Sequence, residues 1–86
     1  MTPAGFADAV RSFAGWSRGS VTSYIRSAER NRQVGGHPES LHMVGLAADI
    51  VYSPNPKPPI TQAKRRALKL GMKLIREGDH DHLQAL

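Results

Sequence analysis

Two stretches of the chain space their apolar residues as an amphipathic helix does. The first helix is predicted over residues 4–14 and ends before Gly15. Its apolar positions are Phe6, Ala9, Val10 and Phe13. The second helix is predicted over residues 61–76. Its apolar stripe is Ile60, Ala63, Ala67, Leu70 and Leu74.

Three other stretches are typical of strands. Residues 20–27 are rich in β-branched and aromatic side chains, and residues 80–86 form a short segment after Gly78. In residues 46–52, Leu46, Ala48 and Ile50 alternate with Ala47, Asp49 and Val51. Because side chains alternate across a strand, Asp49 is expected to point away from the Leu46 and Ile50 face. Residues 28–34 are expected to form a helical turn.

These elements do not alternate as βαβ units. The pattern therefore predicts an α+β fold with a small, mainly antiparallel sheet flanked by helices. The 86 residues leave room for a single domain over residues 1–86. A domain of this size has a marginal core, and the chain has no cysteine for a disulfide. A bound metal is then the remaining common means of stabilisation. No apolar run is long enough to span a membrane, so membrane insertion is not expected.

The chain is basic, with 12 Lys and Arg against 7 Asp and Glu, a net charge of +5 and a pI near 10.3. Such a balance favours an anionic partner. The basic positions Arg65, Lys69, Lys73 and Arg76 lie mostly off the apolar stripe of the second predicted helix, where we expect a solvated face. Nucleic-acid binding by this face is the weaker interpretation. Phe13 and Trp16 are expected in the core.

Two clusters could carry chemistry. Residues 40–49 and residues 77–82 together contain three of the four histidines and four of the seven carboxylates. In an extended His80-x-His82 segment both imidazoles point to one face, and Asp49 can approach from a neighbouring strand. Imidazole nitrogen and carboxylate oxygen are zinc ligands, and a nearby carboxylate can act as a general base. Asp81, between the two histidines, is expected on the opposite face and at the surface.

The residues Ser40-x-His42-x-x-Gly45-x-Ala47-x-Asp49, followed by Asp79-His80-x-His82, resemble the zinc D-alanyl-D-alanine carboxypeptidase family. This family includes bacterial cell-wall carboxypeptidases and phage endolysins, and its fold is related to that of the hedgehog signalling domain. The likeness extends upstream over residues 24–36.

The resemblance implies that one zinc ion is bound by His42, Asp49 and His82. It implies that Asp79 is the general base that takes a proton from the attacking water. His80 is then the auxiliary histidine that holds the base or stabilises the oxyanion.

The resemblance also assigns roles on the substrate side. Arg26 would polarise the scissile carbonyl or hold a substrate carboxylate, and Ser40 would lie at the substrate side of the site. One alternative stays open, because Glu77 precedes His80 by three residues as Asp79 precedes His82. In that alternative Glu77 is the base and His80 is the ligand.

The function that the resemblance implies is zinc-dependent hydrolysis of peptide bonds in peptidoglycan stem peptides, by a D-Ala-D-Ala carboxypeptidase or a cell-wall endopeptidase. Peptidoglycan is the expected partner, and nucleic acid is not expected. Residues 1–10 lack the features of a secretory signal, so we expect synthesis in the cytoplasm and action at the cell wall, as a phage or prophage product. The alternative is a non-catalytic, zinc-stabilised module for cell-wall binding or assembly, since few residues are available for the walls of a cleft.

Overall fold

The computed structural model describes residues 1–24 and 46–86. The positions predicted for Arg26, Ser40 and His42, and the helical turn predicted over residues 28–34, lie outside the described residues. Within the described residues, the helices are α1 (Pro3–Ser17) and α3 (Ile60–Lys69). The strands are β1 (Ser20–Tyr24), β2 (Ala47–Val51), β3 (Met72–Glu77) and β4 (His80–Ala85).

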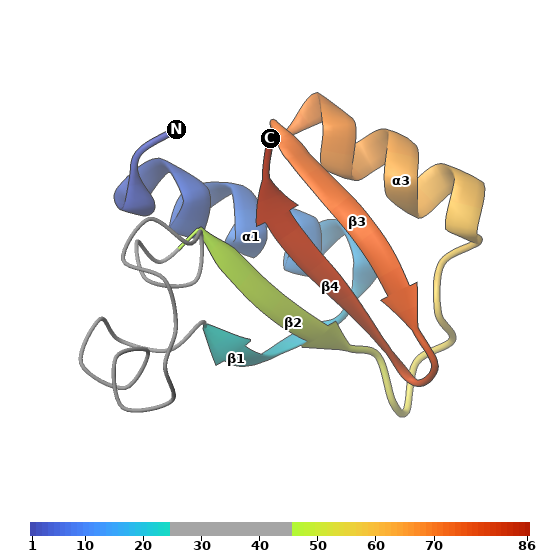
Figure 1. Cartoon of the computed structure of the whole chain (residues 1–86). Helices are drawn as coiled ribbons and strands as arrows, with labels where there is room; N and C mark the ends of the chain where they lie inside the picture. The colour runs from blue at the N-terminus through green and yellow to red at the C-terminus, as the bar shows by residue number, and fades with distance from the viewer. Residues whose placement is uncertain (25–45) are drawn as a thin grey trace.

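The four strands form one antiparallel sheet in the order β1-β2-β4-β3 (Figure 1). The last strand in the sequence, β4, therefore lies inside the sheet, between β2 and β3. A tight turn at Gly78 joins β3 to β4, and the turn uses a positive φ of 63° that favours glycine. This arrangement confirms the predicted α+β fold with a small antiparallel sheet and flanking helices.

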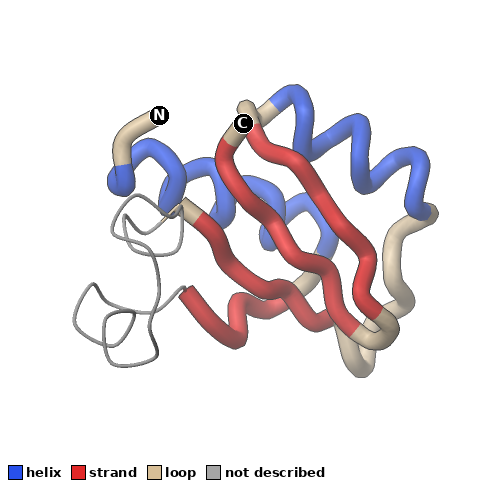
Figure 2. Tube along the Cα trace, in the orientation of Figure 1, coloured by secondary structure: helices blue, strands red, loops and turns tan. Residues whose placement is uncertain are grey.

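The helices and one face of the sheet enclose the core (Figure 2). Helix α1 contributes Phe6, Val10 and Phe13, and α3 contributes Ala63 and Ala67, all with no exposed surface. The strands contribute alternate positions, among which Ile50, Met72, Leu74 and Leu83 are buried. The opposite face of the sheet is left open by both helices. Neither of these helices combines the length and apolar character that a bilayer span requires.

Helix α1 begins and ends with recognisable caps. The Thr2 hydroxyl accepts a hydrogen bond from the Gly5 amide at 3.0 Å, and Pro3 occupies the first helical position. At the other end, Arg18 adopts a left-handed conformation and its amide donates to the Ala14 carbonyl. The helix therefore starts one residue before the prediction and continues three residues beyond it.

The helix predicted over residues 61–76 was wrong in its second half. Helix α3 ends at Lys69, Gly71 turns the chain with a φ of 79°, and residues 72–77 form β3. The strand buries Met72 and Leu74 and exposes Lys73 and Ile75, which is the alternation of a strand. Leu74 fits both the helical period of α3 and the alternation of β3. The apolar stripe of the predicted helix therefore continues past the turn at Gly71.

Asp81 was also predicted wrongly, although its face was right. It does point away from His80 and His82, but that side of β4 faces the helices, and Asp81 is fully buried. The Tyr52 hydroxyl donates to its Oδ2 at 2.6 Å, and Arg76 Nε donates to its Oδ1 at 2.8 Å. Arg76 thus serves an internal ion pair and not a basic helix face.

Burial raises the pKa of Asp81, but the hydrogen bonds from Arg76 and Tyr52 outweigh it and hold that pKa below its ordinary value. Burial and the hydrogen bond to Asp81 raise the pKa of Tyr52.

Phe13 and Trp16 were both predicted in the core, and the prediction is right for only one of them. Phe13 is buried, whereas Trp16 keeps 37% of its surface exposed.

Candidate metal centre

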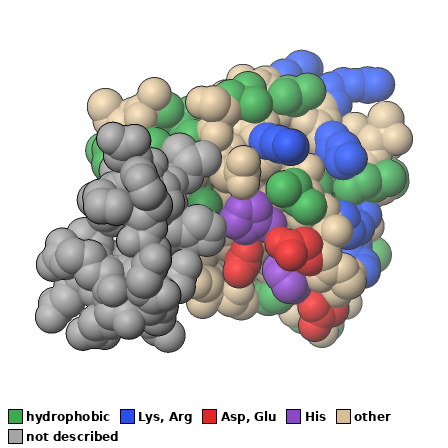
Figure 3. Space-filling model, viewed as in Figure 1, with side chains coloured by type: hydrophobic (Ala, Val, Ile, Leu, Met, Phe, Trp, Pro, Cys, Tyr) green, Lys and Arg blue, Asp and Glu red, His purple; other side chains and the backbone are tan. Residues whose placement is uncertain are grey.

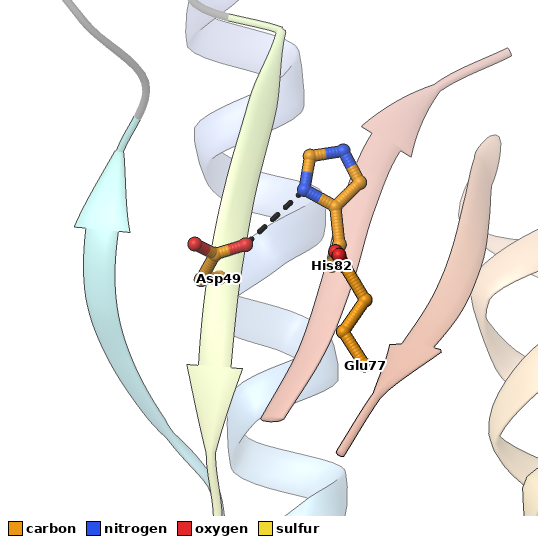
Figure 4. Close-up of side chains that lie close together, drawn as sticks. All are labelled: Asp49, Glu77 and His82. Atoms are coloured by element: carbon orange, nitrogen blue, oxygen red, sulfur yellow. Dashed lines mark hydrogen bonds and ion pairs between the residues drawn. The ribbon is translucent and has the colours of Figure 1, made fainter. Parts of the chain in front are cut away.

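Asp49 and His82 face each other on the open side of the sheet. They are direct partners in the register between β2 and β4. The Nδ1 atom of His82 lies 3.1 Å from Oδ1 of Asp49 (Figure 4). Only 13% of the His82 side chain and 36% of the Asp49 side chain are exposed. The alternation predicted for residues 46–52 is confirmed, because Ala48 and Ile50 are buried and Asp49 projects from the other face.

Glu77 approaches the same point from β3. It is paired with His80 in the register between β3 and β4, so its side chain projects from the open face and reaches across β4 toward His82 (Figure 4). One ligand atom from each of Asp49, Glu77 and His82 lies within 4.8 Å of the other two. Figure 3 shows histidine and acidic side chains gathered on this face, with lysine and arginine toward β3 and α3.

The arrangement of these donors fits a metal ion. Two donors of a tetrahedral zinc ion, with bonds of about 2.0–2.1 Å, lie roughly 3.3 Å apart. The 3.1 Å between His82 Nδ1 and Asp49 Oδ1 is close to that value. One imidazole and two carboxylates are also ligand types that zinc accepts. The residues described can therefore hold part of a zinc site with small side-chain adjustments.

The His82 ring is oriented by a second contact. Its Nε2 atom lies 3.1 Å from Oε1 of Gln84, two residues along the same face of β4. Metal-bound histidines commonly have such a partner on the second ring nitrogen, which fixes the orientation of the ring. Gln84 therefore supplies to His82 the kind of support that a ligand histidine requires.

Asp79 and His80 form a separate pair where β4 begins. The Nδ1 atom of His80 lies 3.0 Å from Oδ1 of Asp79. This hydrogen bond lowers the pKa of Asp79 and raises the pKa of His80. The Asp79 side chain is 95% exposed and is not among the three residues whose ligand atoms converge.

The buried Asp81 network anchors the strand that carries both histidines. Asp81 and Arg76 are direct partners between β4 and β3, and Arg76 also donates to the Pro58 carbonyl at 2.8 Å. Tyr52, the residue that directly follows β2, joins the same network through its hydrogen bond to Asp81. It therefore links β4, β3 and the loop before α3 directly beneath His80 and His82.

Of the predicted site residues, the structure brings Asp49 and His82 together and joins Asp79 to His80. The predictions at Arg26, Ser40 and His42 fall outside the described residues. The sequence analysis places Glu77 in the site only in the alternative where His80 is the ligand. In the structure Glu77 lies beside His82. The tight turn at Gly78 could have predicted this position, because it pairs Glu77 with His80 and so places Glu77 on the same face of the sheet as His80 and His82.

Comparison with known proteins gives one positive result. The family model described as Peptidase M15 matches residues 6–84. No curated protein and no solved structure matches the chain. Peptidases of this family are zinc-dependent and act on peptidoglycan peptides. The match covers nearly the whole sequence and both histidine- and carboxylate-containing clusters. The chain therefore belongs to the peptidase M15 family, the zinc D-Ala-D-Ala carboxypeptidase family.

Proposed function

We propose that this chain hydrolyses peptide bonds in peptidoglycan stem peptides, as a D-Ala-D-Ala carboxypeptidase or a cell-wall endopeptidase. The observation that carries the proposal is the Asp49–His82 pair, with 3.1 Å between donor atoms on the open face of the sheet, in a member of this family. The proposed place of action is the bacterial cell wall, as a phage or prophage product.

The proposed ligands of one zinc ion are His42, Asp49 and His82. When bound, zinc supplies a Lewis acid and lowers the pKa of a water molecule that attacks the peptide bond. The register supports two of these ligands, because β2 and β4 present Asp49 and His82 side by side. Glu77 adds negative charge within reach of the same point, which favours a divalent cation there.

Asp79 is the proposed general base, and His80 its partner. The Asp79 carboxylate is ionised at neutral pH and can accept a proton, while the hydrogen bond from His80 lowers its pKa and so makes it a weaker base. The hydrogen bond from His80 orients that carboxylate, and a protonated His80 can stabilise negative charge that develops on the substrate carbonyl. Arg26 and Ser40 are proposed to hold the substrate, with Arg26 at the scissile carbonyl or at a substrate carboxylate.

The proposal is tested by measuring hydrolysis of a defined stem pentapeptide and of cross-linked peptidoglycan. We expect the wild type to release D-Ala or new amino groups, to lose this activity with a chelator, and to regain it with zinc. Asp49→Asn should lower the rate by about a hundredfold or more, because it weakens a proposed ligand. Asp8→Asn, the same change on the exposed side of α1, is the matched control and should leave the rate unchanged.

Two outcomes would contradict this function. Asp49→Asn acting at the wild-type rate would remove Asp49 from the site. A wild type that binds zinc and yet releases no product from either substrate would support the alternative, a non-catalytic module for cell-wall binding or assembly.

A further inference from the structure

A second feature of the surface lies on the helices and is distinct from the metal centre. Helix α3 contains four cations and no carboxylate, and they are Lys64, Arg65, Arg66 and Lys69. Arg65 and Lys69 are four residues apart and Arg66 and Lys69 three, so like charges are neighbours, which destabilises a helix. Within the part of the chain that the structure describes, no carboxylate forms an ion pair with Arg65, Arg66 or Lys69.

Three of these cations line a pocket together with an aromatic ring. The Cζ atom of Arg66 lies 4.9 Å from the centroid of the Trp16 ring, in a cation–π contact. Phe13 supports the same ring from the core, with 5.6 Å between centroids. Trp16, Arg65, Arg66 and Lys69, together with Gln62, line a pocket of about 170 Å³ between the end of α1 and α3.

The size and lining of this pocket define the ligand it suits. Pockets for drug-sized molecules span roughly 300–1,000 Å³, so this one accommodates a single small group. Guanidinium and ammonium groups supply hydrogen-bond donors and positive charge but no acceptors. Gln62 adds an amide that can also donate. A phosphate or phosphodiester group has the charge, the acceptor oxygens and the size that such a lining recognises.

We propose that this pocket binds the phosphodiester groups of an anionic cell-wall polymer. The choice of this polymer rests on the proposed function, which brings the chain to the cell wall. Helices α1 and α3 pack on one face of the sheet, and Asp49 and His82 project from the other. The polymer and a stem peptide can therefore be bound at the same time, and the basic pocket would hold the protein on its insoluble substrate.

The contacts of Trp16 favour such a polymer over nucleic acid. Proteins that bind single-stranded nucleic acid stack bases on exposed aromatic rings. Here Arg66 covers one face of the Trp16 ring and Phe13 packs at a tilt of 56°. The ring therefore positions the Arg66 guanidinium and has less surface left for a stacked base, so recognition depends mainly on phosphate.

The sequence has a single tryptophan, so its fluorescence reports directly on this pocket. We expect titration of the full chain with soluble poly(glycerol phosphate) to change Trp16 fluorescence in a saturable manner that added salt weakens. The double variant Arg65→Gln/Lys69→Gln should bind about tenfold more weakly or worse. The control Lys64→Gln/Lys73→Gln lowers the net charge from +5 to +3 equally, since each pair removes two charges, and should stay within about twofold of wild type.

Several results would overturn the proposal. An equal loss of binding in both double variants would mean that affinity follows net charge and not this pocket. Single-stranded DNA that binds more tightly than the polymer at the same phosphate and salt concentrations would identify a nucleic-acid surface. An unchanged Trp16 signal at saturating polymer would exclude the pocket. Because the assay measures binding without hydrolysis, a catalytically inactive protein that still binds the polymer would separate this proposal from the proposed function.

Discussion

Among the residues that the structure describes, Asp79 and Glu77 are the carboxylates that could accept a proton beside the Asp49–His82 pair. Asp79 has the spacing from His82 that the family resemblance implies and is held by His80 at 3.0 Å. Glu77 lies closer to the pair, with a ligand atom within 4.8 Å of both Asp49 and His82. Proximity to the pair therefore favours Glu77 as the base, whereas position in the motif favours Asp79. Replacing each carboxylate by its amide distinguishes the two assignments.

We expect Asp79→Asn to lower kcat on a stem peptide by about 10²–10⁴-fold, which is the usual contribution of a general base. Glu77→Gln should lower kcat by less than about tenfold, because Glu77 only adds negative charge near the cation. Steady-state kinetics of both variants with saturating zinc measures the difference. If Glu77→Gln has the larger effect, the base is Glu77 and the role proposed for Asp79 is wrong.

The face on which a single residue lies could be predicted where apolar and polar residues alternate along a strand. The alternation in residues 46–52 placed Asp49 on the polar face, and that prediction is confirmed. Asp81 was expected at the surface because it points away from the two histidines, but a charged residue can be buried when it has partners. The partners, Tyr52 and Arg76, come from other strand and loop positions, and only the strand order brings them to Asp81. The proximity of Glu77 to His82 likewise depends on register, which the sequence pattern alone did not supply.

The boundary between α3 and β3 depends on Gly71. This glycine has a φ of 79°, where a residue with a side chain is strained. We expect Gly71→Ala to lower the free energy of unfolding by about 1–2 kcal/mol. Gly15→Ala is the matched control, because a methyl group there meets nothing within 4 Å and α1 should gain up to about 1 kcal/mol. Urea unfolding of both variants measures the two opposite effects. Equal stability of the two would show that the turn places no demand on residue 71.

The buried ion pair determines how firmly β4 is joined to β3. Asp81→Asn leaves the Arg76 guanidinium without its counter-charge, and since Arg76 is about a quarter exposed we expect a loss near the lower limit for such pairs, about 3 kcal/mol. Tyr52→Phe removes one hydrogen bond and should cost about 1–2 kcal/mol. Asp79→Asn, the same change on an exposed carboxylate, should leave the unfolding free energy nearly unchanged. Chemical denaturation followed by circular dichroism tests this order, and an Asp81→Asn protein as stable as wild type would contradict it.

Elements were predicted well where the period of the pattern was unambiguous. The strands in residues 46–52 and 80–86 and the first helix are confirmed within a few residues at their ends. The helix over residues 61–76 failed because Leu70 and Leu74 continue the stripe of α3 by coincidence. A strand of six residues that follows a helix after a two-residue turn offers few positions from which to recognise a period of two.

At the scale of the described residues, the side chains of the metal centre and the cations of α3 lie on different sides of the sheet. The open face of the sheet carries Asp49, Glu77 and two histidines, whereas α3 carries only cations. A divalent cation suits the first surface and an anion the second. The net charge of +5 obscured this division, because composition gives the sum of the charges and not their positions. The sheet order that separates the two surfaces was beyond the reach of the sequence pattern.

Metal binding should stabilise the whole fold. The chain has 86 residues and no cysteine, and the pair Asp49 and His82 joins β2 to β4 near the middle of the sheet. A ligand that binds only the folded state at a thousand times its dissociation constant adds about 4 kcal/mol. For a domain of this size that corresponds to a rise in Tm of at least about 15 °C. We expect chelator-treated protein to melt that much lower than protein saturated with zinc.

The matched variant for this measurement is His82→Gln. It should melt at nearly the same temperature with and without zinc, because it lacks a proposed ligand, while Asp8→Asn should respond as the wild type does. A zinc-independent Tm in the wild type would mean that the sheet holds Asp49 and His82 together unaided and that the ion contributes nothing to folding. A zinc response that survives in His82→Gln would place the stabilising ion elsewhere. Since both results are read from unfolding alone, they test the metal centre whether or not the protein cleaves a peptide bond.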